Sequence, residues 1–232
     1  MEFIYLGLGI IFVFMAGYFM YKKGIKKGMD DFLKILLTSG FDHKINAFNI
    51  QNTFIEKGGI VFVGDSITQD YNVYEYFHGL NVYNRGIGGD TTKGLLSRLH
   101  LSIFDLEPKI VVILIGTNDF ALLKTTVEEV YMNIELIVKK IKIKLPKTKI
   151  ILQSVYPVNE TLSPMTVLPR KNEIIRKLND LLSQIKDVEY VQLFDLLIDE
   201  HGQLNKKYTV EGLHINEQGY ALITKTLDEY LK

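Results

Sequence analysis

The run Ile110-Val111-Val112-Ile113-Leu114-Ile115 holds six consecutive aliphatic side chains, and Gly116-Thr117-Asn118-Asp119 follows it directly. An apolar run of this length without alternation is typical of a strand buried on both faces, as the strands of parallel sheets are. The polar turn that follows stands at the carboxyl end of that strand. The stretch therefore predicts a central parallel strand that brings polar groups to one edge of a sheet.

Four more segments have strand-like patterns, at residues 59–64, 81–84, 149–154 and 190–194. Helix-like segments lie between and after them, at residues 126–145, 169–185 and 216–231. The first of these helices opens on Thr126-Val127-Glu128-Glu129, a capping box, and Asn216 is the expected cap of the last. Strands alternating with helices indicate an α/β fold of three layers, with a five-stranded parallel sheet between two layers of helices.

The composition excludes several classes of protein. The chain has 232 residues, which suits one α/β domain and a short appendage. Equal numbers of basic and acidic residues, 27 of each, argue against a nucleic-acid-binding protein that uses a broad basic face. The absence of Cys excludes a disulfide scaffold, a thiolate nucleophile, and zinc or iron–sulfur sites with Cys ligands.

Residues 3–21 form an uncharged apolar stretch. As a helix it would be roughly 28 Å long, close to the hydrocarbon thickness of a bilayer. A buried core helix would carry a polar stripe, and a cleaved signal peptide would have a basic start, which Met1-Glu2 does not provide. We interpret residues 1–27 as a single transmembrane anchor with a basic flank, formed by Lys22, Lys23, Lys26 and Lys27.

The basic flank favours a cytoplasmic domain by the positive-inside rule, although a single-span signal can be overridden and the side of the membrane is left open. Residues 28–57 are expected to form a juxtamembrane helix and a lead-in, the helix covering 29–38 and ending at Gly40. Residues 58–232 then form the α/β domain.

Ligands of open parallel sheets bind beyond the carboxyl ends of the strands. Polar motifs stand at three such ends, and a fourth precedes the last helix: Gly64-Asp65-Ser66, 84–92, Gly116-Thr117-Asn118-Asp119, and Glu211-Gly212-Leu213-His214. Each alone has an ordinary interpretation, since serine often caps helices and glycine-rich loops are often turns. The glycine run does not fit nucleotide motifs, because Thr91 and Leu95 stand where Gly and Lys are required. No metal motif is present either, and we expect no metal and no cofactor.

Together the four motifs resemble those of the SGNH/GDSL hydrolase superfamily, in order and spacing, over about residues 60–220. Gly64-Asp65-Ser66 is similar to the nucleophile block, 86–92 to the glycine block, 116–119 to the asparagine block, and Glu211-x-x-His214 to the acid-x-x-His block. The branch of platelet-activating-factor-acetylhydrolase-like esterases is the most similar. The resemblance implies a flavodoxin-like sheet and a serine hydrolase.

The resemblance also implies roles for individual residues. Ser66 would be the nucleophile, His214 its base and Glu211 the acid that orients the imidazole; the Ser66 and Gly89 N–H groups and the Asn118 amide would form the oxyanion hole. The superfamily usually has Asp where Glu211 stands, and Glu is longer by one methylene. Asp65 and Asp119 are expected to hold turns, and Arg85 to be structural.

These residues predict a membrane-anchored serine esterase, of acylhydrolase or lipase type, that hydrolyses short-chain, acetyl-type carboxylic esters. The substrate would be a small-molecule, carbohydrate or lipid ester, the partner a membrane through residues 3–21, and no nucleic acid is expected. A thioesterase or lysophospholipase, or a binding module with weakened catalysis, remains open, as does the oligomeric state. The aromatic side chains after Ser66 could form an apolar rim or belong to the core; they are Tyr71, Tyr74, Tyr76 and Phe77.

Overall fold

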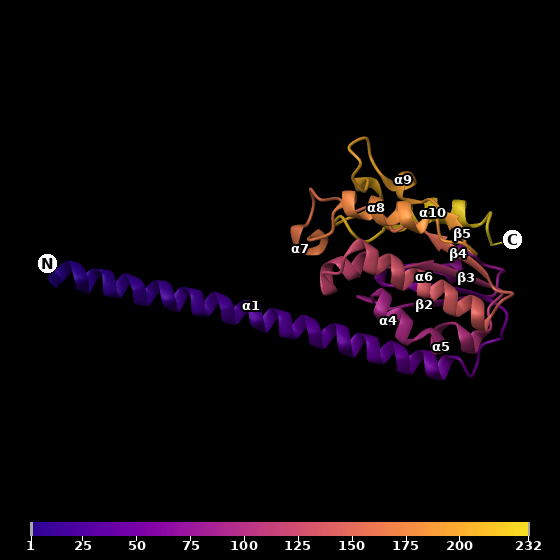
Figure 1. Ribbon diagram of the computed structural model, residues 1–232, viewed down its shortest axis with the longest axis horizontal. Coiled ribbons are helices and arrows are strands. Elements are labelled where there is room, and N and C mark those ends of the chain that lie inside the picture. Colours follow the sequence, from indigo (N-terminus) through magenta and orange to yellow (C-terminus); the bar gives the residue numbers. More distant parts are fainter. Residues whose placement is uncertain (1, 232) are drawn as a thin grey trace. The chain divides into compact units, whose positions relative to one another are not determined.

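The computed structural model describes residues 2–231, and for residues 2–17 the backbone alone. The chain divides into two compact units, Met1–Asp42 and His43–Lys232. Helix α1 (Glu2–Gln51) accounts for the described part of the first unit and contributes its last turns to the second. The sheet and all other helices belong to the second unit (Figure 1).

Five parallel strands form one sheet in the order β2-β1-β3-β4-β5. Their bounds are β1 (Ile60–Gly64), β2 (Val82–Gly86), β3 (Ile110–Leu114), β4 (Lys149–Gln153) and β5 (Glu189–Val191). This is the flavodoxin-like strand order, in which the crevice lies where the order reverses, beside β1 and β3. In register, Gly64 lies opposite both Gly86 and Leu114, so three strands end at one level.

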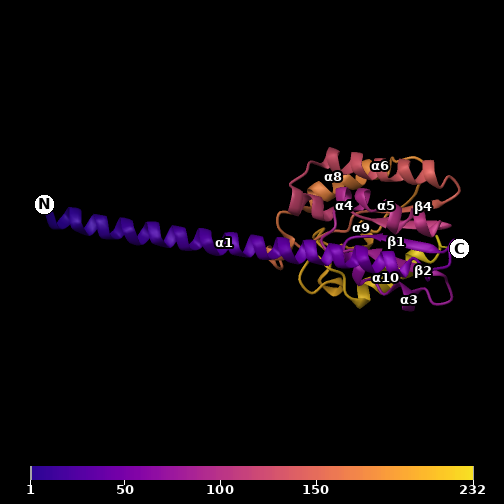
Figure 2. The ribbon, with the colours of Figure 1, turned by 90° about the horizontal axis from the view of Figure 1, so that it is seen from below.

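Short and long helices cover both faces of the sheet. They are α2 (Ser66–Asp70), α3 (Val73–Tyr76), α4 (Thr92–Ser97), α5 (Leu99–Ser102), α6 (Val127–Lys144), α7 (Pro164–Val167), α8 (Asn172–Leu182), α9 (Phe194–Leu197) and α10 (Glu217–Leu227). Figure 2 shows α6 and α8 on one side of the sheet and α3 and α10 on the other. The predicted three-layer α/β/α fold with a five-stranded parallel sheet is confirmed.

The alternation of side chains along each strand produces two separate cores. Val61 and Val63 of β1 pack toward α4, α6 and α8, whereas Ile60 and Phe62 pack toward α3 and α10. All four side chains are almost completely buried. Burial on both faces explains why these strands read as continuous apolar runs in the sequence.

Capping residues in the sequence predicted the starts of two long helices correctly. Thr126 and Glu129 form the predicted capping box at the start of α6, and Asn216 caps α10 through the N–H groups of Gln218 and Gly219. Helix α8 begins at Asn172, three residues later than the sequence predicts, because Lys171 keeps an extended backbone (φ −133°, ψ 131°) and acts as its N-cap.

The predicted helix end at Gly40 is wrong, because α1 continues to Gln51. A glycine inside a helix weakens it by only about 1 kcal/mol, which tertiary packing can offset. In the second unit Phe48 is buried, and the Arg85 guanidinium lies 4.7 Å from the centre of its ring. Asn52, just past the helix, donates to the carbonyl of Leu101 at 2.8 Å. These contacts stabilise the last turns of α1.

The predicted transmembrane span, residues 3–21, falls largely on residues whose side chains lie outside the described part of the chain. Among the residues that were described, no helix is both long enough and apolar enough to cross a bilayer. From Lys22 onward α1 includes frequent charges, so the part of this helix whose side chains are described has no long apolar stretch. The finding contradicts the predicted single-pass membrane location and the cytoplasmic orientation drawn from the Lys cluster.

Gly86 is required by the close approach of α2 to the end of β2. A Cβ atom at this position would overlap the backbone of Thr68 and Gln69, which cannot move without displacing α2. We expect Gly86→Ala to lower the free energy of unfolding by about 2 kcal/mol or more, as in other overpacked sites. Urea unfolding followed by circular dichroism measures this change.

Gly28→Ala is the matched control, because nothing lies within 4 Å of a Cβ there and the helix should tolerate or gain from alanine. Equal stability of the Gly86→Ala variant and the wild type would show that α2 can retreat from β2.

Candidate active site

Ser66 stands where β1 gives way to α2. The side chain of Asp65 caps this short helix, its Oδ1 accepting a hydrogen bond from the Ile67 N–H at 3.0 Å. Ser66 is the first residue of the helix and is partly exposed. Its own backbone N–H makes no hydrogen bond within the described residues, as expected in the first turn of a helix. The nucleophile block thus presents both a hydroxyl and an N–H group at the edge of the sheet.

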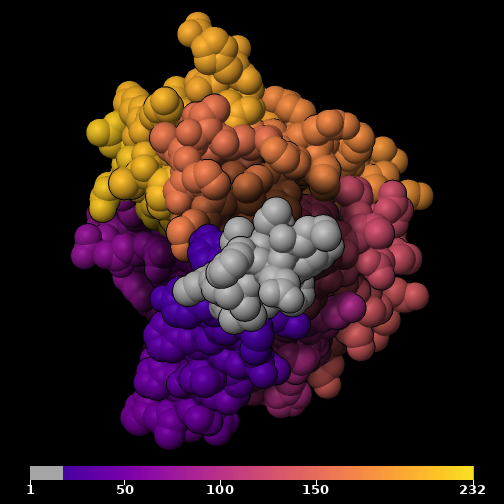
Figure 3. All heavy atoms as spheres, turned by 90° about the vertical axis from the view of Figure 1, so that its left-hand side faces the viewer, coloured from indigo at the N-terminus to yellow at the C-terminus, as the bar shows by residue number. Residues whose placement is uncertain are grey.

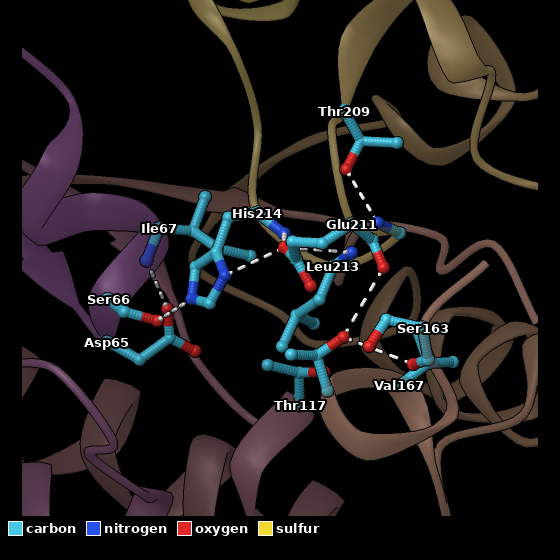
Figure 4. A network of polar contacts seen from close by, with 12 residues as sticks. Asp65, Ser66, Ile67, Thr117, Ser163, Val167, Thr209, Glu211, Leu213 and His214 are labelled. Atoms are coloured by element: carbon cyan, nitrogen blue, oxygen red, sulfur yellow. Dashed lines mark hydrogen bonds and ion pairs between the residues drawn. The ribbon is translucent and has the colours of Figure 1, made fainter.

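His214 reaches Ser66 from the loop before α10. Its Nε2 lies 3.0 Å from the Ser66 Oγ, although the two residues are 148 positions apart in the chain (Figure 4). On the opposite side of the ring, Nδ1 lies 2.9 Å from the Glu211 Oε1. With its proton on Nδ1 the imidazole donates to Glu211, and Nε2 can then accept the hydroxyl proton of Ser66.

Glu211 turns back toward its own segment, and one carboxylate oxygen does most of the bonding. Oε1 accepts from the His214 ring, from the His214 backbone N–H at 2.5 Å and from the Leu213 N–H at 3.3 Å. Burial acts to raise the pKa of Glu211, but the hydrogen bonds from the His214 backbone N–H and ring, together with the positive charge that His214 can carry, lower it below its ordinary value. The other oxygen, Oε2, is buried without a hydrogen-bond partner among the described residues.

The segment 155–170 supports the loop that carries Glu211. The Ser163 N–H and the Thr166 hydroxyl both donate to the Glu211 carbonyl at 3.3 Å, and the Asn159 N–H donates to the Gly212 carbonyl at 2.7 Å. Figure 3 shows these two parts of the chain, in orange and yellow, side by side on one face. Segments 45 to 53 positions apart are thus held together beside the imidazole.

The glycine loop lies next to Ser66. A Cβ built on Gly88 would be 4.0 Å from the Ser66 Cβ, and the Gly88 N–H donates to the Gln69 Oε1 at 3.0 Å. Gly89 has a φ of 74°, a left-handed conformation that glycine adopts without strain. Its N–H has no hydrogen-bond partner within the described part of the chain. The loop can therefore offer this N–H to a ligand.

Asn118 follows β3 and is buried. Its Nδ2 donates one proton to the Asp90 carbonyl at 3.0 Å, and its Oδ1 accepts from the Arg170 Nη2 at 2.7 Å. A guanidinium can only donate, so the oxygen of the amide must face Arg170 and the nitrogen must face the glycine loop. One amide proton is left over for a further acceptor.

The five predicted site residues therefore meet at one edge of the sheet. Ser66, His214 and Glu211 form a hydrogen-bonded chain, and Gly89 and Asn118 belong to the two neighbouring loops. Such an arrangement can activate a hydroxyl and stabilise an oxyanion. Among the residues described, no group of three or more acidic or histidine side chains is placed to hold a metal ion.

The family model for the GDSL-like lipase/acylhydrolase family matches residues 62–222, which include all of these residues. The chain belongs to the GDSL-like lipase/acylhydrolase family. It is accordingly a hydrolase that acts on ester bonds. The resemblance drawn from the four sequence motifs is confirmed.

Several similar proteins carry names from the expected branch of this acylhydrolase family. The chain is 35% identical over 181 residues to platelet-activating factor acetylhydrolase IB subunit alpha2 of Rattus norvegicus, covering 74% of this chain and 75% of the relative. A structure from Streptococcus pneumonia, provisionally described as a platelet activating factor, matches with a TM-score of 0.82 and 33% identity, covering 88% of this chain and 98% of the other. A GDSL-like lipase from Bacteroides thetaiotaomicron matches with a TM-score of 0.67 and 25% identity, covering 81% and 96%.

Buried charged residues that the sequence analysis did not select support this acylhydrolase site. Asp90 and Arg98 form an ion pair of 2.8 Å, with both side chains almost fully buried. Arg170 contacts Asn118, as described above. Asp90 lies in the glycine loop and Arg98 in the turn between α4 and α5, so two opposite charges eight positions apart could have indicated this pair. The pairing of Arg170 with Asn118 across 52 positions has no signal in the sequence.

The expected turn and structural residues do what the sequence suggested. Asp119 accepts hydrogen bonds from both the N–H and the hydroxyl of Thr92, at 3.0 and 2.5 Å, and so fastens α4. Arg85 is buried against α1 rather than at the site, where its Nη2 donates to the Asn52 Oδ1 at 2.9 Å.

The aromatic side chains after Ser66 belong mainly to the core. Tyr71 and Phe77 are buried, and Tyr71 stacks on Tyr220 with ring centroids 4.8 Å apart. Tyr76 is half-buried, and Tyr74 alone of the four is exposed. The core interpretation is therefore correct for Tyr71 and Phe77.

Burial raises the pKa of Asp65 from 3.8 to about 7, against the opposing effect of the Ile67 N–H. In the unfolded chain this carboxyl ionises near its ordinary value, so between about pH 4 and 7 the folded state holds a proton that the unfolded state lacks. Stability should therefore fall as the pH rises through this window. We expect Asp65→Asn, which keeps the capping oxygen, to remove this contribution; urea unfolding of both proteins at pH 5 and 7.5 measures it.

Asp70→Asn is the control, since it removes an exposed carboxylate from the same short helix. If the wild type and the Asp65→Asn variant lose stability in parallel between the two pH values, Asp65 does not hold the extra proton.

Proposed function

We propose that this acylhydrolase is a serine esterase that hydrolyses short-chain, acetyl-type esters with Ser66, His214 and Glu211 as its catalytic triad. The observation that carries the proposal is the 3.0 Å contact between the Ser66 Oγ and the His214 Nε2. A serine hydroxyl has a high pKa and becomes a nucleophile only when a base within hydrogen-bond distance accepts its proton.

In the first step the Ser66 Oγ attacks the ester carbonyl while His214 takes the hydroxyl proton. The resulting imidazolium is stabilised by Glu211, whose pKa is held below its ordinary value and which is therefore ionised at neutral pH. The tetrahedral intermediate expels the alcohol, which receives the proton from His214. Water then attacks the acyl-serine with His214 again as base, releasing the acid and restoring the hydroxyl.

Three donors are available for the oxyanion: the Ser66 N–H, the Gly89 N–H and the second amide proton of Asn118. Support comes from the hydrogen bonds that the neighbouring groups already make. The Gly88 N–H is occupied by Gln69, whereas the N–H groups of Ser66 and Gly89 have no partner among the described residues. Donors fixed in advance stabilise the developing charge without reorganisation.

The acyl group is proposed to be short because the relatives at 35% identity, which match 74% of this chain, are named acetylhydrolases. The alcohol part would belong to a carbohydrate, a lipid or another small molecule.

The wild-type chain should hydrolyse p-nitrophenyl acetate with a higher kcat/KM than p-nitrophenyl octanoate. Ser66→Ala should leave less than about a hundredth of the wild-type kcat, because the nucleophile of a triad cannot be replaced by its neighbours. A fluorophosphonate probe followed by peptide mapping should label Ser66.

Ser97→Ala is the matched control, since Ser97 is exposed and its hydroxyl only bonds the Gly94 carbonyl. A Ser66→Ala variant with wild-type kcat would exclude Ser66 as the nucleophile. A preference for octanoyl or acyl-CoA substrates would instead move the function to a lipase or thioesterase on the same triad.

Glu211→Gln is expected to reduce kcat by about 10²-fold or more while the fold is kept. Because all three bonds are made to Oε1, the oxygen of Gln can replace them, and the main loss is the negative charge that stabilises the imidazolium. Glu211→Asp should also lose activity, because its carboxylate falls one methylene short of these three donors. Steady-state kinetics with p-nitrophenyl acetate measures both.

Glu217→Gln, an exposed change in the first turn of α10, serves as the control. A Glu211→Gln variant with wild-type kcat would mean that the protein works as a Ser66–His214 dyad.

A further inference from the structure

Arg170 is a buried cation whose hydrogen bonds all go to neutral oxygens. The residue is 5% exposed and lies between α7 and α8. Its Nε donates to the carbonyl and hydroxyl of Thr117 at 3.2 and 3.1 Å, and its Nη1 donates to the Thr166 carbonyl at 2.7 Å. Its Nη2 donates to the Asn118 Oδ1 at 2.7 Å. The fork of the guanidinium therefore joins the end of β3 to the segment that carries α7.

The burial of this charge destabilises the folded state. Among the described residues no carboxylate lies within ion-pair distance of Arg170, unlike the equally buried Arg98 with its partner Asp90. Burial lowers the pKa of Arg170, against the charges of Asp65 and Glu211, but a guanidinium remains protonated in proteins. A buried cation without a contacting anion usually destabilises a protein, so a purely structural purpose is a poor explanation for it.

The contact with Asn118 fixes the orientation of the amide. A turn of the amide by 180° would place its oxygen against the Asp90 carbonyl and its NH2 group against the guanidinium, and both contacts are repulsive. The charged contact at 2.7 Å is the stronger of the two constraints, and it holds Nδ2 with one proton on the Asp90 carbonyl at 3.0 Å. A charged donor at the oxygen also polarises the amide and makes its N–H groups better donors.

We propose that Arg170 is a positioning residue for ester hydrolysis, which holds the Asn118 amide with its N–H toward the developing oxyanion. The inference rests on the oxyanion role of Asn118 given above. Arg170 acts through Asn118 and does not touch the substrate. Its benefit arises in the transition state, where negative charge appears, and not when the uncharged ester binds.

The same side chain also supports the acid of the triad. Thr166 accepts from Arg170 through its carbonyl, and its hydroxyl proton is shared between the carbonyls of Ser163 at 3.1 Å and Glu211 at 3.3 Å. One guanidinium thus connects the oxyanion donor with the loop of Glu211 and His214. Arg170 keeps the two halves of the site, from the middle and the end of the chain, in one arrangement.

The test compares Arg170→Met, Asn118→Ala and the double variant in steady-state kinetics with p-nitrophenyl acetate. Asn118→Ala is expected to lower kcat by about 10²–10³-fold, as for a lost oxyanion donor. Arg170→Met should lower kcat by about 10–10²-fold with KM changed by less than about 3-fold, because only the transition state is affected. In the Asn118→Ala background the Arg170→Met change should lower kcat by less than about 2-fold, since residues that act through one contact are not additive.

Arg176→Met is the matched control, because Arg176 is an exposed arginine of α8 that pairs with Asp195. It should keep wild-type kcat. Guanidinium ion at concentrations well below denaturing ones should restore part of the kcat of Arg170→Ala and none of that of Asn118→Ala. A merely structural arginine would give equal fold losses in both backgrounds and no rescue, and either result would overturn the proposal.

If Arg170→Met does not fold, Arg170→Lys replaces it, since a single ammonium keeps the charge but lacks the fork that joins Thr117, Asn118 and Thr166. A loss of kcat on Arg170→Lys that is equally large in the Asn118→Ala background would contradict the proposal. If the wild type shows no esterase activity, the proposed function fails. If the wild type is active and Asn118→Ala keeps the wild-type kcat, the oxyanion role of Asn118 is excluded, and the role of Arg170 with it.

Discussion

The buried ion pair of Arg98 with Asp90 is the interaction on which the geometry of the site depends. Besides Asp90, this guanidinium donates to two strand carbonyls. They belong to Gly64, the last residue of β1, at 3.0 Å, and to Arg85, the last residue but one of β2, at 2.8 Å. One side chain therefore fixes the end of the strand before Ser66, the end of the neighbouring strand and the glycine loop. Asp90 balances the charge of Arg98, so Arg98 makes these hydrogen bonds without being a buried cation that lacks an anion.

Two more buried polar contacts extend this arrangement to β3. Asp119 holds α4 through Thr92, and Arg170 holds Asn118, so each loop at the edge of the sheet is fastened by at least one buried side chain. Ser66, Glu211 and His214 are themselves only partly buried. A rigid, buried support under partly exposed reactive groups is the condition for donors that need no reorganisation during the reaction.

The fold was predictable because its signals are local. Runs of aliphatic residues marked the doubly buried strands, and the caps at Thr126 and Asn216 marked two long helices. The error in α1 has the opposite origin, since Gly40 looked like a local stop and the helix continues to Gln51. Its last turns are held by the packing of Phe48 against Arg85, a residue 37 positions later that belongs to a strand of the sheet. No local pattern contains that contact.

The sequence by itself determined the layers of the fold and the polar groups at the carboxyl ends of the strands, because each strand and the motif that follows it consist of consecutive residues. It placed Ser66, Asn118 and His214 at strand or helix boundaries, and the parallel sheet then had to bring them to one side. Only the tertiary structure decided which N–H groups remain unpaired, how Glu211 turns toward His214, and which buried arginines hold the loops. These choices depend on hydrogen bonds between segments far apart in the chain, whose distances and directions follow from packing and leave no periodic trace in the sequence.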